Sequence, residues 1–310
     1  MSEVLYRKLA VVGCGLIGGS VVRAARATGT VEEVAVAEVN PAFRARLIEL
    51  GVADLVTGDL AEAVRGADLV VLATFPSALA AVAREIGPHL KPGATLTDVG
   101  SVKAPVGAAL AEAAAPGVFV IPGHPIAGTE QSGPDAGFAE LFHDRWTILC
   151  PRETGQEGYG AAVERLARFW EALGANVELM DERRHDMVMA VTSHLPHLIA
   201  YTIVGTAEHL ETVSEGEVMK FSAGGFRDFT RIAASDPVMW RDVFLLNKEA
   251  VLEIVARFME DLQSLTRAIR YGDGQTLEEH FARTREIRRG VIAAGQEMAE
   301  PNFGRDKTRT

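Results

Sequence analysis

The sequence predicts an α/β domain built on a parallel sheet, followed by an all-helical domain. In the first half, short β-branched runs alternate with Ala-rich stretches of helical pattern, which is typical of strand–helix–strand units. After Met180 the strand signals stop, and the chain has a helical pattern almost throughout to Gln296. The length of 310 residues suits about two domains. We therefore expect a first domain over residues 1–180 and a second over residues 181–310.

Each element of the first domain is predicted by its own pattern. Apolar periodicity predicts helices such as Gly19–Thr28, Pro41–Leu50 and Gly155–Gly174. The predicted strands are Leu9–Val12, Val34–Glu38, Leu69–Ala73, Thr95–Val99, Val118–Ile121, Trp146–Cys150 and Asn176–Met180.

One long helix is predicted in the second domain. Asp236 followed by Pro237 is an N-cap residue with proline at the first helical position. Apolar residues then recur at helical spacing from Val243 to Ile269, and Gly272 stops the helix. A helix this long needs an extensive packing partner, so we expect a homodimer formed through this domain.

Composition excludes several classes of function. With 31 basic and 42 acidic residues the net charge is −11, which argues against nucleic acid and against an anionic membrane as partners. The two cysteines, Cys14 and Cys150, cannot form a disulfide framework and suit a reducing compartment. No secretory leader and no apolar run of spanning length stands out. We expect a cytoplasmic protein that acts on a small molecule.

A glycine-rich loop follows the first predicted strand and opens a helix. In such a loop the first glycine permits a tight turn, the second lets a pyrophosphate approach, and the third allows close packing of helix on strand. Glu38 lies twenty residues beyond the last glycine, at the end of the second strand. Together these features predict a Rossmann-type dinucleotide-binding domain rather than a merely structural turn. The expected cofactor-binding residues here are Gly13, Gly15, Leu16, Ile17, Gly18 and Glu38.

Glu38 also favours NAD over NADP. A carboxylate at this position can accept hydrogen bonds from the ribose hydroxyls and repels a 2′-phosphate. Val39 and Asn40 supply no cation, and Arg44 and Arg46 are expected on a solvated helix face.

Ser101 and His124 follow later strands of the predicted sheet, at the edge where ligands of open α/β sheets lie. His124 is expected in a Gly/Pro-flanked loop and suits proton chemistry near neutral pH, although a histidine in a surface loop without such a role is the alternative. Ser101 could equally be the N-cap of the next helix.

Two further groups of side chains fall in the helical domain. Histidines cluster at His185, His194 and His197, which makes metal binding an alternative, but the cluster has no HExxH or cysteine-rich signature. Arg231 lies three residues beyond Asp228 and could bind a substrate carboxylate, or form a structural ion pair.

These motifs together resemble the prephenate/arogenate dehydrogenase family of tyrosine biosynthesis. The resemblance covers roughly residues 8–270, and the motifs beyond the glycine loop are specific to that family. The motifs are GCGLIGGS (13–20), DVGSVK (98–103), GHPIAGTEQSG (123–133), VTSHLPH (191–197) and GGFRDFTRIAASDPVMWRD (224–242).

The resemblance implies a role for each matching residue. It makes His124 the catalytic histidine, with Ser101 in contact with both the substrate hydroxyl and the nicotinamide. Arg231 would bind a substrate carboxylate. The remaining residues that it places around the substrate are His185, His194, His197, Thr129 and Glu130, and those that it places near the cofactor are Thr74 and Pro76.

The implied reaction is NAD-dependent oxidative decarboxylation of prephenate, with arogenate as the alternative substrate and no metal required. The segment ATFPS (73–77) departs from the family pattern. The chain looks like the stand-alone form, without an added regulatory or chorismate mutase domain.

Two other functions are alternatives to this reaction. A β-hydroxyacid-type dehydrogenase would use Lys220 or Lys248, and an NAD sensor would need no proton acceptor.

Overall fold

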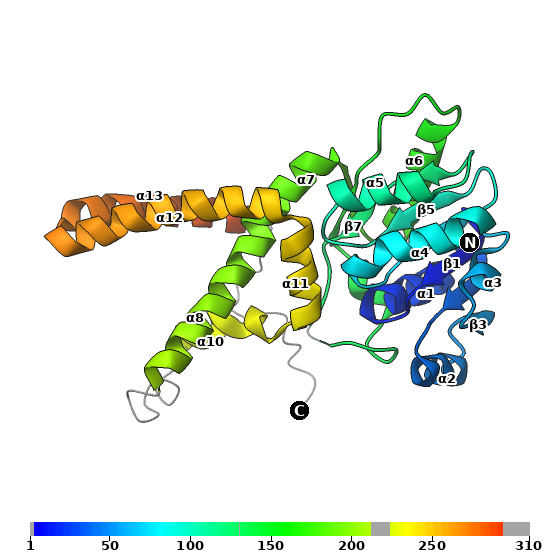
Figure 1. Ribbon diagram of the computed structural model, residues 1–310, viewed down its shortest axis with the longest axis horizontal. Helices are drawn as coiled ribbons and strands as arrows, with labels where there is room; N and C mark the ends of the chain where they lie inside the picture. The colour runs from blue at the N-terminus through cyan, green and yellow to red at the C-terminus, as the bar shows by residue number, and fades with distance from the viewer. Residues whose placement is uncertain (1–2, 130, 212–223, 294–310) are drawn as a thin grey trace. The chain divides into compact units, whose positions relative to one another are not determined.

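The computed structural model describes residues 3–129, 131–211 and 224–293 (Figure 1). The chain divides into two compact units, Met1–Leu252 and Glu253–Thr310. The first unit contains the sheets and every described residue of the expected site. The second contains most of one long helix and the helix after it.

A six-stranded parallel sheet forms the framework of the first unit. The spatial order 3-2-1-4-5-6 is that of a dinucleotide-binding sheet, and the order reverses between β1 and β4. Ligands of such sheets lie outside the carboxyl ends of the strands at that reversal. In spatial order the strands are β3 (Leu55–Thr57), β2 (Val31–Ala37), β1 (Tyr6–Val12), β4 (Leu69–Leu72), β5 (Thr95–Asp98) and β6 (Phe119–Val120).

Helices cover both faces of this sheet (Figure 1). Alternate residues of β1 point to opposite faces, so that Leu9 and Val11 join one buried cluster while Ala10 and Val12 join the other. The helices and 3₁₀ turns of this part are α1 (Leu16–Thr28), α2 (Pro41–Glu49), α3 (Leu60–Val64), η1 (Pro76–Ala78), α4 (Leu79–Ile86), η2 (Gly87–His89), α5 (Ala104–Ala113), η3 (Ala139–Phe142) and α6 (Tyr159–Ala172).

The last three strands form a second, three-stranded sheet, whereas the sequence predicts one parallel sheet. The predicted strand at Trp146–Cys150 is β8 (Trp146–Leu149), which pairs antiparallel with β7 (Gly123–Pro125) and parallel with β9 (Asn176–Leu179). The pattern of Gly123–Pro125 is too short to predict a strand. His124, expected in a loop, therefore lies in β7, where its register partner is Ile148.

All described elements after β9 are helices, as the sequence predicts. A π-helical turn, η4, stands between α7 and α8 and precedes Pro196, whose ring and missing N–H disturb the helix just before it. The helices and turns of this part are α7 (Glu182–Met189), η4 (Ala190–His194), α8 (Leu195–Glu211), α10 (Gly224–Thr230), η5 (Arg231–Ala234), α11 (Pro237–Leu246), α12 (Lys248–Tyr271) and α13 (Gly274–Ala293).

The run Glu182–His209 is long and apolar enough to cross a membrane by length and composition alone, contrary to our expectation. Asp186 and His194 lie in this run with less than a tenth of their surface exposed. Asp186 accepts backbone hydrogen bonds from the start of α5, so the run is packed against the sheet part of its own unit.

The predicted long helix is two helices, which corrects the sequence reading. Asp236 caps α11 by accepting from the backbone N–H groups of Val238 and Met239, as expected. The helix stops at Asn247, whose φ of −100° and ψ of 27° are not helical, and α12 starts at the next residue. The buried Asn247 amide reaches the backbone of α7 and a histidine of η4, which holds it in place.

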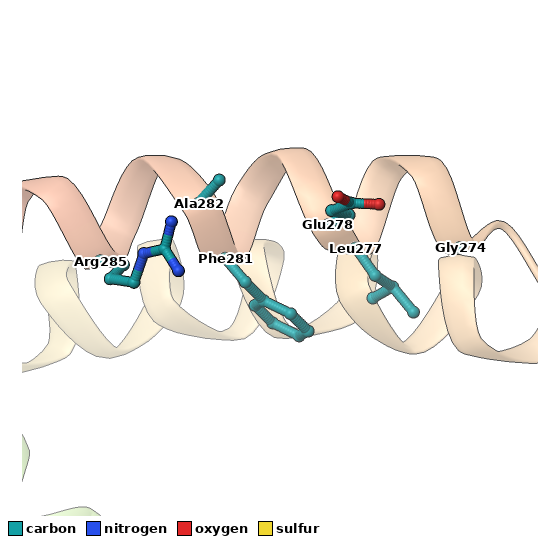
Figure 2. A pocket seen from close by; sticks show the side chains of 6 residues that line it. All are labelled: Gly274, Leu277, Glu278, Phe281, Ala282 and Arg285. Carbon is teal, nitrogen blue, oxygen red and sulfur yellow. The ribbon is translucent and has the colours of Figure 1, made fainter.

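In the second unit, Gly272 takes a left-handed φ of 69° between α12 and α13. An open hollow of about 450 Å³ lies along α13, where Leu277 and Phe281 point to the same side of the helix (Figure 2). It is lined by residues of α13 alone and holds none of the expected site residues.

Candidate active site

The glycine loop between β1 and α1 has the geometry that close approach of a ligand requires. Gly13 takes a φ of 87°, and a Cβ there would lie 2.7 Å from the backbone oxygen of Ala73. A Cβ at Gly18 would lie 2.1 Å from the oxygen of Gly13, which is too close for any side chain. A Cβ at Gly15 would meet nothing within 4 Å, so the loop is open on that side. Leu16 and Ile17 begin α1, whose N-terminal N–H groups suit a phosphate.

Glu38 lies beside this loop at the end of β2. One carboxylate oxygen accepts from the backbone N–H of Cys14 at 3.1 Å, and the other accepts from that of Asn40 at 2.9 Å. Glu38 is 8% exposed, and both carboxylate oxygens accept a backbone hydrogen bond, yet each keeps a further lone pair for a ribose hydroxyl. The loop and Glu38 thus fit a dinucleotide.

Both Arg44 and Arg46 are expected on a solvated helix face, but only Arg46 is exposed. Nη1 of Arg44 donates to the backbone oxygens of Glu38 and Val39, both at 2.8 Å, so its guanidinium lies at the turn after β2. Arg46 pairs with Asp135 at 2.8 Å and with Glu49 at 3.0 Å.

Thr74 and Pro76 follow β4 on the other side of the sheet's reversal point. A Cβ at Gly13 would lie 3.1 Å from the Thr74 methyl, so Thr74 packs against the glycine loop. Its hydroxyl is buried without a hydrogen-bond partner in the described part of the chain. Pro76 is buried at the start of η1.

Ser101 follows β5, near a buried cation that the sequence reading did not single out. Lys103 is fully buried, and its ammonium donates to Oδ2 of Asp98 and to the backbone oxygen of Gly123, both at 2.5 Å. Lys103 thereby joins the Ser101 segment to the residue before His124. The N-cap of α5 is Lys103, so the alternative role of Ser101 as that cap is wrong.

His124 projects from β7 and is only partly exposed. Its Nδ1 lies 2.8 Å from Nε2 of His185, and the two rings meet edge to face. Burial is the main cause that lowers the pKa of His124 well below 6.5, and the charges of His185, Lys103 and His194 lower it further. The ring is therefore neutral at physiological pH and can accept a proton.

His185 has no exposed surface, and both of its ring nitrogens have protein partners. Its Nδ1 lies 2.9 Å from Oδ1 of Asp186, while its Nε2 faces His124. This leaves no ring nitrogen for a substrate, which revises the expected place of His185 in the pocket lining.

His194 and His197 lie on one face of the η4–α8 run and against Trp240. The ring of His197 stacks on Trp240 with centroids 3.6 Å apart, while His194 meets it edge to face at 6.0 Å. Burial lowers the pKa of His194 to about 4 and also lowers that of His197. Trp240 packs with Val102 and Val243 in a small core.

Arg231 begins η5 and is exposed, and its charge helps to lower the pKa of His197. The carboxylate of Asp228, which the sequence places near Arg231, lies 3.8 Å from Nε of Arg227. Thr129 is exposed and accepts from the backbone N–H of Gln131 at 3.2 Å, and Glu130 lies outside the described residues.

A β-hydroxyacid-type dehydrogenase would use Lys220 or Lys248. Lys248 is exposed on α12, and Lys220 is not among the described residues.

No group of three or more His, Cys, Asp or Glu side chains that could hold a metal occurs within 3–129, 131–211 and 224–293.

Sequence reasoning gave no role to the buried groups behind the histidines, namely Asp186, Lys103, Asp98 and Asn247. The charged residues next to His185 and Ser101 were available signals, because a charge inside an apolar pattern is usually paired when it is buried.

Comparison with known proteins decides the family. Residues 21–179 match the nucleotide-binding domain of prephenate dehydrogenase, and residues 181–283 match its dimerisation domain. The chain belongs to the prephenate dehydrogenase family. The glycine loop lies just before the first matched span, so its assignment rests on its geometry.

Individual relatives of the chain support the same family assignment. The chain is 41% identical to cyclohexadienyl dehydrogenase of Zymomonas mobilis, over 92% of this chain and 96% of that protein. It is 31% identical to prephenate dehydrogenase of Bacillus subtilis, over 94% of this chain and 77% of that protein. Among solved structures, Aquifex aeolicus prephenate dehydrogenase in complex with hydroxyphenyl propionate and NAD⁺ superposes with a TM-score of 0.85 at 33% identity, covering 94% of this chain and 99% of that one.

Proposed function

We propose that this chain catalyses the NAD-dependent oxidative decarboxylation of prephenate to 4-hydroxyphenylpyruvate. The observation that carries the proposal is a neutral, partly exposed His124 at the ligand-binding edge of a dinucleotide-binding fold, in a chain of this family. Within the chain, residues 1–180 would bind the cofactor, and residues 181–310 would complete the substrate site and form the dimer.

NAD is the cofactor that the geometry of the first domain suits. The loop Gly13–Gly18 would hold the pyrophosphate and Glu38 the ribose hydroxyls, with Thr74 and Pro76 beside the loop. When bound, NAD supplies a hydride acceptor at the sheet's carboxyl edge. The Aquifex relative, solved with NAD⁺, supports this assignment.

The chain's own residues would position the substrate and take its proton. A neutral His124 accepts a hydrogen bond from the ring hydroxyl, and this bond strengthens as the C–O bond gains carbonyl character. Ser101 would hold the same oxygen, and Arg231 would bind a carboxylate. His197, with Trp240 behind it, would line the substrate site. Loss of CO₂ makes the ring aromatic and drives the reaction, so the protein mainly orients the reactants.

Arogenate is a second candidate substrate, alone or beside prephenate. The relative at 41% identity is named cyclohexadienyl dehydrogenase, and the ring chemistry is the same for both substrates. Steady-state rates with prephenate and arogenate, each with NAD and NADP, test both candidates. We expect NADH formation together with CO₂ release from prephenate. NADH formation only with 3-hydroxy acids would overturn the proposal.

We infer that the protein is a cytoplasmic homodimer formed through its helical domain. Large apolar side chains lie exposed along α12 and α13 of the single chain, which the match to a dimerisation domain explains. Among them Ile269 is 67% exposed and Ile287 is 62% exposed. Light scattering at micromolar concentration should give twice the chain mass of 33.2 kDa, and a monomer mass would exclude this assembly.

A further inference from the structure

The proposed base His124 and two side chains behind it form a continuous hydrogen-bonded row. Nδ1 of His124 lies 2.8 Å from Nε2 of His185, and Nδ1 of His185 lies 2.9 Å from Oδ1 of Asp186. His185 and Asp186 are at most 5% exposed, so water cannot readily replace either contact. The row joins β7 to the first turns of α7.

Asp186 is fixed as the acceptor end of this row. Its Oδ1 also accepts from the backbone N–H of Lys103 at 2.7 Å, and its Oδ2 accepts from that of Ala104 at 2.9 Å. Backbone N–H groups can only donate, so both carboxylate oxygens act as acceptors. The hydrogen between His185 and Asp186 therefore sits on Nδ1 of His185.

The position of every other hydrogen follows from this one. Burial lowers the pKa of His185, so its ring is neutral, and its Nε2 carries a lone pair. The contact at 2.8 Å then requires the hydrogen to sit on Nδ1 of His124. Nε2 of His124 is left with a lone pair, which makes it the basic nitrogen.

We propose that His185 and Asp186 are positioning residues for His124, which hold its ring in the tautomer with hydrogen on Nδ1 so that Nε2 accepts the proton of the substrate hydroxyl. The proposal rests on the proposed function and deepens it. When the hydroxyl O–H bond breaks, its proton bonds to Nε2 and its electron pair stays on oxygen. The charged ring then keeps its Nδ1–H directed through His185 toward the Asp186 carboxylate, which stabilises it.

The charged groups around the row account for its rigidity. Lys103 with its partner Asp98 lies on the sheet side, and its ammonium also holds the Gly123 oxygen next to His124. His194 lies on the helical side, and Asn247 donates to its Nδ1 at 3.1 Å and to the backbone oxygen of Asp186 at 2.8 Å. The residue before His124 is therefore held by Lys103, and the His124 ring contacts His185 of α7.

Nitrogen-15 NMR of histidine-labelled protein without cofactor or substrate tests the proposal directly. A ring nitrogen that carries hydrogen has a shift far from that of one with a lone pair, and couplings to the carbon-bound ring hydrogens distinguish Nδ1 from Nε2. The His124→Asn variant identifies the signals of His124. We expect wild-type His124 to carry hydrogen on Nδ1 at pH 7.5. If the spectrum of the wild type shows the hydrogen of His124 on Nε2 instead, that result alone overturns the proposal.

Two substitutions at the middle of the row separate positioning from packing. His185→Phe keeps a ring of similar size but accepts no hydrogen bond, whereas the amide of His185→Gln can accept from His124 and donate to Asp186. We expect His185→Phe to lose the Nδ1–H tautomer of His124 and to lower kcat about 10- to 100-fold, with KM for prephenate little changed. His185→Gln should keep the tautomer and recover most of kcat.

His89→Phe, the same change at an exposed histidine, is the matched control and should leave both readouts unchanged. A wild-type tautomer that survives in His185→Phe would contradict the positioning role, as would equal losses of kcat in the Phe and Gln variants. Absence of turnover by the wild type, with the expected tautomer present, would instead contradict the proposed function and leave the tautomer assignment standing.

Discussion

The glycine loop follows β1 of the six-stranded sheet, and the row of His124, His185 and Asp186 joins β7 of the second sheet to α7; the two are built in opposite ways. The loop consists of backbone, and its critical positions are ones where a side chain is excluded, as at Gly13 and Gly18. The row consists of titratable side chains, with the partly exposed His124 in front of the buried His185 and Asp186, and each has its hydrogen-bonding role fixed by the next. Binding a cofactor requires open space and free N–H groups, whereas moving a proton requires a basic nitrogen of known orientation.

This difference predicts where each kind of substitution acts. Changes in the loop should alter cofactor affinity or folding, and changes in the row should alter the rate of the chemical step.

The largest effect is expected at His124. His124→Asn keeps much of the volume but removes the basic nitrogen, so kcat should fall about 10²- to 10⁴-fold while KM changes little. Because burial lowers the pKa of His124, the wild-type ring stays neutral on falling pH until well below 6.5, and only then does activity decline. Profiles of kcat/KM against pH should show this acidic limb in the wild type and not in the variant. An acidic limb with its midpoint above 6.5 would contradict this assignment.

Two alanine substitutions sharpen the contrast within the loop. Gly15→Ala meets no atom within 4 Å, so thermal stability should not change, but the methyl group would obstruct the pyrophosphate. We expect NAD to bind about 10- to 100-fold more weakly by calorimetry, as for overpacking worth about 1–3 kcal/mol. Gly18→Ala collides with the Gly13 oxygen and should lower the melting temperature instead. Equal stability losses in both variants would contradict this account of the loop.

Arg231 should show a smaller effect, confined to substrate binding. A charge-assisted hydrogen bond is worth about 1.5–3 kcal/mol when buried, and the exposure of Arg231 places the expected loss near the lower end. Arg231→Ala should raise KM for prephenate about tenfold, with kcat and NAD affinity little changed. Arg227→Ala, at a neighbouring exposed arginine, serves as the control. An unchanged KM in Arg231→Ala would remove it from the substrate site.

The smallest expected effect is on cofactor choice at Glu38. The Arg44 guanidinium already lies at the turn after β2, so Glu38→Ser removes a repulsive carboxylate and leaves a cation close by. We expect the preference for NAD over NADP in kcat/KM to narrow several-fold. Adding Arg44→Ala should abolish the gain with NADP. A wild type that already prefers NADP would contradict the role of Glu38.

The features that the sequence predicted are local ones. The glycine loop, the N-cap at Asp236 and the alternation of strands and helices depend on neighbouring residues, and each is confirmed. The glycine spacing and the position of Glu38 predict the cofactor side of the proposed site from local sequence alone.

The features that it missed depend on contacts between distant residues. Asn247 ends α11 because its side chain bonds to α7 and η4, and no pattern near residue 247 reports those partners. The strand at Gly123–Pro125 exists because β8 pairs with it. The row behind His124 needs residue 185 beside residue 124, which only the packed helical part provides.

The hydrogen bonds from the start of α5 to Asp186 make the row behind His124 depend on a long-range contact. The carboxylate that ends the histidine row also binds backbone N–H groups 82 and 83 residues earlier in the chain. The sheet can form from local strand–helix units, but the row cannot be completed until α7 has docked across this long separation, which is a slow step for a folding chain. The row behind His124 therefore depends on contacts between residues more than 80 positions apart, whereas the glycine loop follows directly from β1.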